Sequence, residues 1–66
     1  MPSEYLLIFD HIVGHFECTF SNYDSAVASG KIRGVDEFSI EGSDGLREHW
    51  LQGYDGEWSK EENYAE

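Results

Sequence analysis

Residues 15–21 read His-Phe-Glu-Cys-Thr-Phe-Ser, and apolar side chains alternate with polar ones throughout this stretch. One side of the extended chain would carry Phe16, Cys18 and Phe20, and the other His15, Glu17 and Thr19. A period of two predicts a β-strand with one buried face. The apolar run from Tyr5 to Phe9 predicts a strand before it. The segment Asp10-His11-Ile12-Val13-Gly14 separates the two strand patterns, which indicates an antiparallel hairpin.

The hydrophobic period changes after this hairpin. Ser21-Asn22-Tyr23-Asp24 has the form of a capping box with Asp in place of Glu, and apolar residues follow at helical spacing. Gly30 stands where a helix typically stops, and Lys31 would complement the negative helix end. The pattern predicts a helix of about two turns over Tyr23 to Ser29.

Alternation returns in the second half of the chain. Asp36 to Glu41 predicts a strand, and the segment 42–45, Gly-Ser-Asp-Gly, predicts a turn. Leu46 to Gln52 would form the returning strand. Neither face of this segment is cleanly apolar, so a short helix over 44–51 is the alternative. Asp55-Gly56 marks a second turn, which a fifth short strand could follow.

These elements predict an α+β fold: a small antiparallel sheet of about four strands in the order β-β-α-β-β, with one short helix packed on one face. Residues 1–60 would form a single domain and 61–66 a flexible acidic tail. A core in a chain of 66 residues contributes only about 3–5 kcal/mol of net stability. Such a core leaves little room for an enclosed active site.

The single cysteine, Cys18, excludes an internal disulfide, and its position between two phenylalanines predicts a buried thiol in a reducing compartment. The chain has no apolar run of about 18 residues, and its start lacks a basic segment. We therefore expect neither a signal peptide nor a membrane span, and a cytoplasmic location.

No residue pattern matches a known catalytic or metal-binding frame. The spacing of the possible zinc ligands follows no common zinc motif; these ligands are His11, His15, His49 and Cys18. Pairs such as Asp36 with Glu48, and the set Ser39, His49 and Asp44, are expected by chance in so acidic a chain and lie in no nucleophile elbow. We expect no enzyme activity, no metal and no cofactor.

Charge is the most distinctive property of the sequence. Fourteen Asp and Glu residues against four Lys and Arg give a formal net charge of -10, and residues 36–66 hold ten of these acids with two bases. Ten aromatic residues, 15 % of the chain, argue for a folded rather than a disordered acidic protein. A charge of this kind steers a basic partner and repels a phosphate backbone. Simple solubility is the alternative reason for it.

Acidic side chains on the outer face of a strand lie about 6.6–6.8 Å apart at positions i and i+2, close to the spacing of successive phosphates. Aromatic residues are the usual anchors of protein interfaces. The candidate partner-binding residues are Asp36, Glu37, Glu41, Asp44, Glu48, Tyr54, Asp55, Glu57 and Trp58. The tryptophans Trp50 and Trp58 would pack at the interface unless they belong to the core.

In size, charge and predicted architecture, the chain resembles the small inhibitors that bacteriophages encode against bacterial defence, namely anti-CRISPR proteins and DNA-mimic antirestriction proteins. The residues behind this resemblance are the acidic half from Asp36 onward and the ending Tyr54-Asp55-Gly56-Glu57-Trp58. Its Asp-Gly-Glu-Trp is similar to one in a small acidic type I anti-CRISPR protein.

The resemblance implies that the protein occupies the lysine- and arginine-lined channel of a CRISPR surveillance complex, a nuclease or a restriction enzyme in the host bacterial cytoplasm. Its carboxylates would take the place of phosphates, without direct contact to nucleic acid or membrane. The competing interpretation is a non-catalytic adaptor or homo-oligomeric regulatory module. An adaptor would depend on aromatic residues and respond little to salt, whereas mimicry would be weakened by salt.

Overall fold

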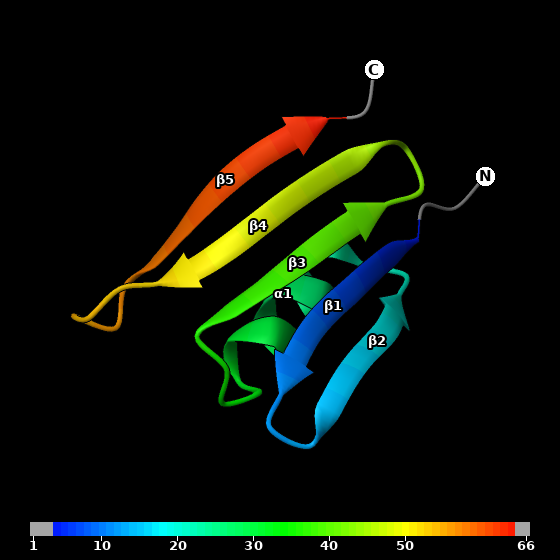
Figure 1. Ribbon diagram of the computed structural model, residues 1–66. Coiled ribbons are helices and arrows are strands. Elements are labelled where there is room, and N and C mark those ends of the chain that lie inside the picture. Colours follow the sequence, from blue (N-terminus) through cyan, green and yellow to red (C-terminus); the bar gives the residue numbers. More distant parts are fainter. Residues whose placement is uncertain (1–3, 65–66) are drawn as a thin grey trace.

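A computed structural model describes residues 4–64, which form a five-stranded antiparallel sheet with one helix on one face (Figure 1). The elements in chain order are β1 (Tyr5–His11), β2 (Gly14–Phe20), α1 (Tyr23–Lys31), β3 (Glu37–Gly42), β4 (Leu46–Gln52) and β5 (Trp58–Tyr64). The strand order across the sheet is β2-β1-β3-β4-β5. The predicted α+β class is confirmed, with five strands rather than four.

Two local units make up the sheet. β1 and β2 form a hairpin with seven register pairs, and β3, β4 and β5 form a meander. α1 carries the chain from the β2 edge back across the sheet, so β3 pairs with β1 from Tyr5↔Gly42 to Ile8↔Ser39. β1 therefore lies between two strands, with Leu7 and Phe9 buried toward the helix and Leu6 and Ile8 half-buried on the other face.

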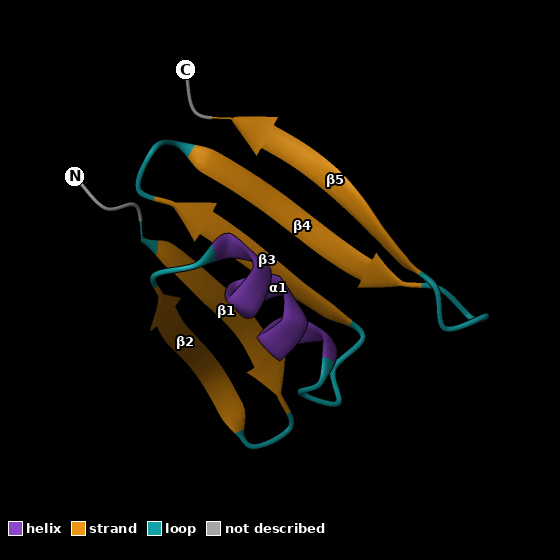
Figure 2. Cartoon of the chain, turned by 180° about the vertical axis from the view of Figure 1, so that it is seen from behind, coloured by secondary structure: helices purple, strands orange, loops and turns teal. Residues whose placement is uncertain are grey.

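The core lies between α1 and the sheet (Figure 2). The fully or nearly buried apolar side chains are Leu7, Phe9, Phe38 and Ile40 from the sheet and Ala26 and Val27 from the helix. The helix packs over β1, β2 and β3. Burying a large apolar side chain contributes roughly 1.5–3 kcal/mol, so these few residues account for most of the hydrophobic stabilisation.

α1 begins at Tyr23, as the sequence predicted, but its N-cap and its C-terminal end differ from the prediction. Asn22, not Ser21, is the N-cap, and its side-chain oxygen accepts a hydrogen bond from the Ser25 backbone N at 3.0 Å. The helix also continues past Ser29 to Lys31. The capping signal was therefore placed one residue early, because Asn caps a helix as well as Ser does.

Gly30 lies inside the helix, although the sequence predicted it as the stop. An added Cβ atom at this position would lie 2.7 Å from ring atoms of Phe38. The glycine is thus required for the close approach of α1 to β3. The chain reverses later, at Gly34, whose φ of +79° lies in the region that favours glycine.

The segment 46–52 is a strand, as the sequence favoured, and the alternative helix over 44–51 does not form. β5 extends through Tyr64 in register with β4, so residues 61–64 of the expected flexible tail belong to the sheet. Residues 65 and 66 lie outside the described residues. No helix in the described part of the chain is long and apolar enough to cross a membrane.

Candidate interaction surface

One face of the sheet is uncovered, because the only helix in residues 4–64 packs on the other face (Figures 1 and 2). We call it the open face. Registered partners on neighbouring strands share a face, so the register identifies its side chains. The acids on it are Asp10, Glu17, Glu37, Glu41 and Glu61. All five are exposed.

The cations are distributed differently. Arg47 is the one Lys or Arg residue on the open face among the described strands, where it is registered with Glu41. On the helix side, the ammonium groups of Lys31 and Lys60 lie 4.8 and 5.6 Å from the Trp50 ring centroid, and the Arg33 guanidinium lies 5.7 Å from that of Phe9. Charge is thus separated between the two faces of one thin sheet.

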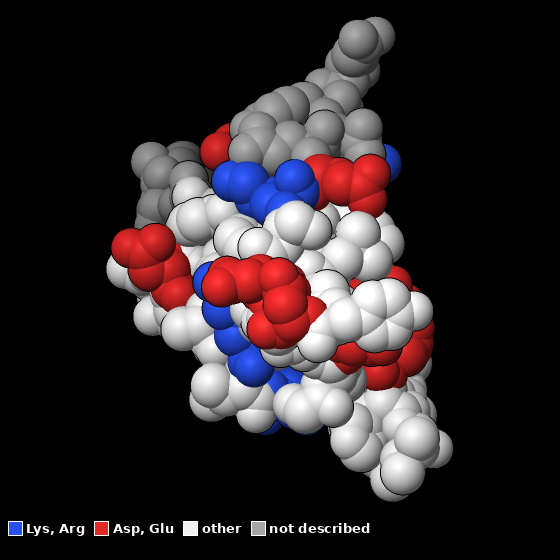
Figure 3. Space-filling view, turned by 90° about the vertical axis from the view of Figure 1, so that its left-hand side faces the viewer, with Lys and Arg blue, Asp and Glu red and all other residues white. Residues whose placement is uncertain are grey.

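Figure 3 views the molecule from the end where the β4–β5 turn projects, with the open face toward the right. Asp and Glu side chains are visible on the right-hand side and also in the middle and at the left, whereas most of the visible Lys and Arg side chains lie nearer the middle and left. Five exposed carboxylates with one arginine give the open face a negative electrostatic potential, which attracts and steers a cationic partner.

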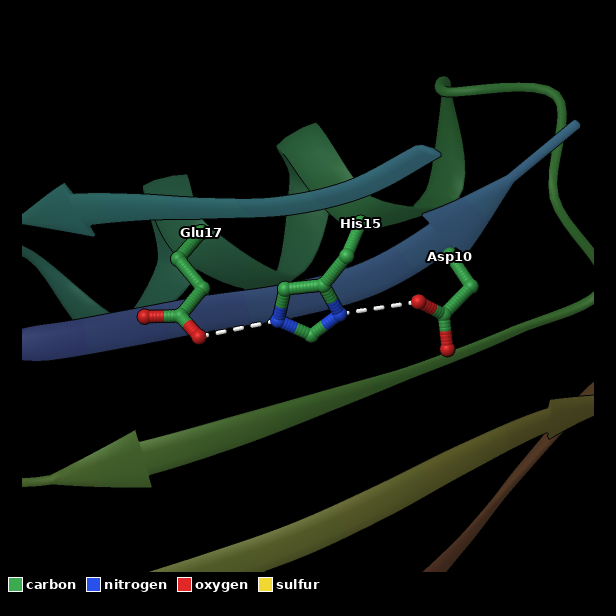
Figure 4. A network of polar contacts seen from close by, with 3 residues as sticks. All are labelled: Asp10, His15 and Glu17. Atoms are coloured by element: carbon green, nitrogen blue, oxygen red, sulfur yellow. Dashed lines mark hydrogen bonds and ion pairs between the residues drawn. The ribbon is translucent and has the colours of Figure 1, made fainter. Parts of the chain in front are cut away.

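A histidine bridges two of the open-face acids (Figure 4). Nδ1 of His15 lies 2.8 Å from Oδ1 of Asp10, and Nε2 lies 2.8 Å from Oε2 of Glu17. The hydrogen bonds to Glu17 and then to Asp10 raise the pKa of His15 above its ordinary value. A protonated His15 donates through both ring nitrogens and is held in one orientation.

Farther along the same face, Nε2 of His49 lies 3.4 Å from Oε2 of Glu37. Between these polar groups the open face has half-buried apolar side chains, Leu6 and Ile8 on β1 and Leu51 on β4. Carboxylates around a small apolar centre match the chemistry of arginine, which combines a charged guanidinium with an apolar stem.

Two shallow depressions mark the open face, and Glu41 lines both. The first, about 270 Å³, is lined by Glu4, Leu6, Thr19, Glu41, Gly42 and Ser43. The second, about 340 Å³, is lined by Ser39, Ile40, Glu41, Arg47, Glu48 and His49. The first depression has two carboxylates and no cationic residue in its lining, so it is suited to a lysine or arginine side chain.

Four predicted residues lie at the end of the sheet where β4 turns into β5. Asp36 and the exposed Tyr54 line a further depression of about 430 Å³, and Asp55 and Glu57 lie in the turn itself. Oδ1 of Asp55 accepts a hydrogen bond from the Glu57 backbone N at 3.0 Å. In the opposite turn, Asp44 accepts from the Leu46 backbone N in the same way, at 3.1 Å. These two aspartates stabilise turns.

Glu48 and Trp58 differ from the other predicted residues because they belong to the interior of the helix side. Glu48 is only 5 % exposed, and its carboxylate accepts hydrogen bonds from the Tyr23 hydroxyl and from Nε1 of Trp50 at 3.2 Å. Nζ of Lys60 lies 3.3 Å from its second oxygen. Trp58 is half-buried against Phe38, with ring centroids 5.2 Å apart. Neither is part of the open face.

Burial and then the hydrogen bond to Glu48 raise the pKa of Tyr23 to about 12. The phenol is therefore neutral and a donor at any physiological pH. Tyr23, Trp50 and Lys60 together compensate the negative charge of Glu48 inside the fold. A buried carboxylate is tolerated only when it is paired and hydrogen-bonded in this way.

The sequence interpretation missed three open-face acids, Asp10, Glu17 and Glu61. It emphasised the acids of the C-terminal half, whereas the pairing of β1 with β2 and β3 brings Asp10 and Glu17 onto the same face as Glu37 and Glu41. It assigned Glu61 to a flexible tail, but this residue lies in β5. The alternation of β2 already placed Glu17 outward. In β1 the apolar run from Tyr5 to Phe9 is continuous, so the sequence does not show which of its side chains lie on the same face as Asp10.

Comparison with models of protein families, with curated proteins and with solved structures found no match to this chain. The fold and surface on their own define a small α+β protein with a helix on one sheet face and exposed carboxylates on the other.

Proposed function

We propose that this protein is an anti-CRISPR-like inhibitor: it binds the basic nucleic-acid-binding surface of a host defence complex through its open face and blocks DNA binding by acidic phosphate mimicry. The observation that carries the proposal is the uncovered sheet face on which five exposed carboxylates accompany a single arginine. The partner would be a CRISPR surveillance complex, a nuclease or a restriction enzyme.

The spacing of these carboxylates supports the proposal. Glu37 and Glu41 lie four residues apart on β3, about 13 Å along the strand. Glu17 and Glu61 lie on the two edge strands and are joined through one cross-strand row, in which the intervening residues are Ile8, Ser39 and His49. The acids are therefore distributed over the face rather than clustered, as phosphates are along a nucleic acid.

Charge also limits what can bind to the open face. A second copy placed face to face would bring five carboxylates against five, and a phosphate backbone would be repelled in the same way. A surface rich in lysine and arginine is the complementary partner.

The proposal is tested with two triple variants that change the net charge equally. Glu37→Gln, Glu41→Gln and Glu61→Gln remove three of the five carboxylate charges of the open face, whereas Asp24→Asn, Asp36→Asn and Glu57→Gln remove three exposed charges outside it. The tagged protein is used as bait in a bacterial lysate that contains CRISPR–Cas and restriction systems, and the captured complex is then titrated against duplex DNA. We expect release by moderate salt, displacement by DNA, and about tenfold or greater weakening for the open-face triple alone.

Equal weakening by the two triples would overturn the role of the open face, because net charge rather than position would then decide binding. Capture of a neutral partner that resists salt would overturn the mimicry altogether. In that case the adaptor function would take its place.

A further inference from the structure

The outer edge of β2 carries a feature that the acidic open face does not use. β2 is the first strand in the sheet order, so one side of its backbone has no strand beside it among the described residues. Exposed sheet edges are usually protected by lysine, proline or a bulge. β2 has neither lysine nor proline, Glu17 is its one Asp, Glu, Lys or Arg residue, and its seven consecutive register pairs with β1 leave no bulge. The other edge strand, β5, carries Lys60 and Glu61.

Exposed apolar side chains gather on the same hairpin. Ile12 and Val13 in its turn are 97 % and 74 % exposed, and Phe16 on β2 is 39 % exposed. Cys18 and Phe20, on the same side of β2, are half-buried beside the core. The apolar side chains of Phe16, Cys18 and Phe20 thus lie along the unpaired edge of β2. An unpaired edge with an apolar row is typical of sites where a further strand is added to a sheet.

The sequence of β2 is symmetric about Cys18. Phenylalanines stand two residues away on each side, at positions 16 and 20, and polar residues stand one residue away, Glu17 and Thr19. An antiparallel pair of identical strands related by a two-fold axis requires this symmetry, because residues at equal distances from the axis face each other.

We propose that two copies of this chain associate through their β2 edges, antiparallel, with Cys18 facing Cys18 of the partner subunit on the two-fold axis. Phe16 then faces Phe20 of the partner subunit twice, and Glu17 faces Thr19 of the partner subunit twice. A two-fold register with Glu17 on the axis would place two carboxylates directly opposite each other, which is destabilising. A register with Thr19 on the axis would set Cys18 against Phe20 and leave Phe16 without a phenylalanine partner. The symmetric pattern therefore selects the Cys18-centred register.

The helices leave room for this pairing. A two-fold axis perpendicular to the sheet puts both helices on one side, each over its own β1. The two β1 strands would be separated by three strand spacings, about 14 Å. Packed helices need only about 8–10 Å between their axes, so the aromatic row of β2 fits between them. The two open faces become one continuous acidic surface on the other side.

Self-association through β2 does not depend on the proposed function, and the two kinds of binding should respond to salt in opposite directions. Each copy carries a net charge of -10, so self-association should strengthen as salt screens the repulsion. Binding of a basic partner should weaken under the same change. Sedimentation equilibrium at low and moderate salt, with protein up to about 1 mM, measures the monomer–dimer equilibrium directly.

Two substitutions at Thr19 test the register. Thr19→Glu would face Glu17 of the partner subunit and weaken the dimer, whereas Thr19→Lys would strengthen it. The matched controls are Ser59→Glu and Ser59→Lys, which change the net charge equally on the exposed open face of the opposite edge strand. We expect a change of about threefold or more in the dimer dissociation constant at Thr19, beyond that at Ser59.

Cross-linking gives a second readout. With diamide as the oxidant of the two thiols, Cys18 should form a disulfide-linked dimer, and the double variant Cys18→Ser with Glu17→Cys should cross-link much more slowly. Sedimentation as a monomer under all conditions would overturn the proposal. So would identical effects of the Thr19 and Ser59 pairs, or faster cross-linking through position 17.

Discussion

The hydroxyl of Tyr23, in the first turn of α1, donates a hydrogen bond to the buried carboxylate of Glu48 in β4. The helix packs over β1, β2 and β3, so this contact ties its start to a strand beyond the helix footprint. Trp50 and Lys60 complete the surroundings of the same carboxylate. Neither face of β4 is cleanly apolar in the sequence, and this strand is held to the helix through the carboxylate of Glu48.

Removing the Tyr23 hydroxyl should destabilise the protein. Tyr23→Phe keeps the ring but leaves the buried Glu48 carboxylate with one donor fewer, which costs about 1–3 kcal/mol. Tyr54→Phe makes the same chemical change at a fully exposed ring and should alter stability by less than about 0.5 kcal/mol. Urea unfolding followed by tryptophan fluorescence measures both. Equal stability of the two variants would show that the buried bond contributes nothing.

The ionisation of Tyr23 should be visible at high pH. Its pKa of about 12 lies above the usual value of about 10, so the fold favours the neutral phenol. The resulting stability is fully present below pH 10 and is lost as pH rises from about 10 toward 12. An ultraviolet titration of phenolate formation should show a late step that Tyr23→Phe removes. A wild-type titration without a late step would contradict the prediction.

His15 should couple stability to pH near neutrality. Its pKa is raised because Glu17 and Asp10 accept hydrogen bonds from the charged ring. The stabilisation is therefore fully present below the unfolded value of about 6.5 and is lost as pH rises through the folded pKa. NMR titration of the ring should show the raised midpoint, and the stability advantage over His15→Gln should shrink across that window. His11→Gln, in the same hairpin, is the control and should leave the His15 midpoint in place.

Gly30→Ala should destabilise the protein even though alanine favours helices. The gain in helix propensity is about 1 kcal/mol, but the new methyl group would overlap the Phe38 ring and cost about 1–3 kcal/mol. Thermal unfolding should show a lower midpoint for the variant. Phe38→Leu should lower stability by itself, yet combining it with Gly30→Ala should cost less than the sum of the two single changes. Strict additivity would mean that the two side chains do not clash.

The strands could be predicted from sequence wherever one face is buried, as the alternation of β2 and β3 shows. The start of the helix at Tyr23 could be predicted too. Its N-cap and its C-terminal end could not, because Asn22 and Ser21 are equally good caps and because the role of Gly30 depends on Phe38, which lies across the core. Glu48 looked like a surface residue for a similar reason. Its hydrogen-bond donor Tyr23 lies 25 positions away in the chain.

The open face was predictable only in part. The alternation of polar and apolar residues in β3 predicted that Glu37 and Glu41 share a face. Which side chains of β1 and β2 lie beside them depends on which strands pair. Pairing of β1 with β3 is a property of the chain path through α1, and no local pattern encodes it. Charge counted along the sequence therefore underestimated the N-terminal contribution.

The pairing of β1 with β3 also governs how the molecule must fold. All other strand pairs join neighbours in the chain through short turns, whereas this one closes a loop that contains β2 and α1. Leu7 and Ile40, both fully buried, face each other across it. Closing such a loop costs chain entropy before any contact offsets it, so the step is expected to limit the folding rate. Hydrogen exchange at Leu7 and Ile40 should then require opening of the whole domain, whereas the outer part of β5 can open on its own.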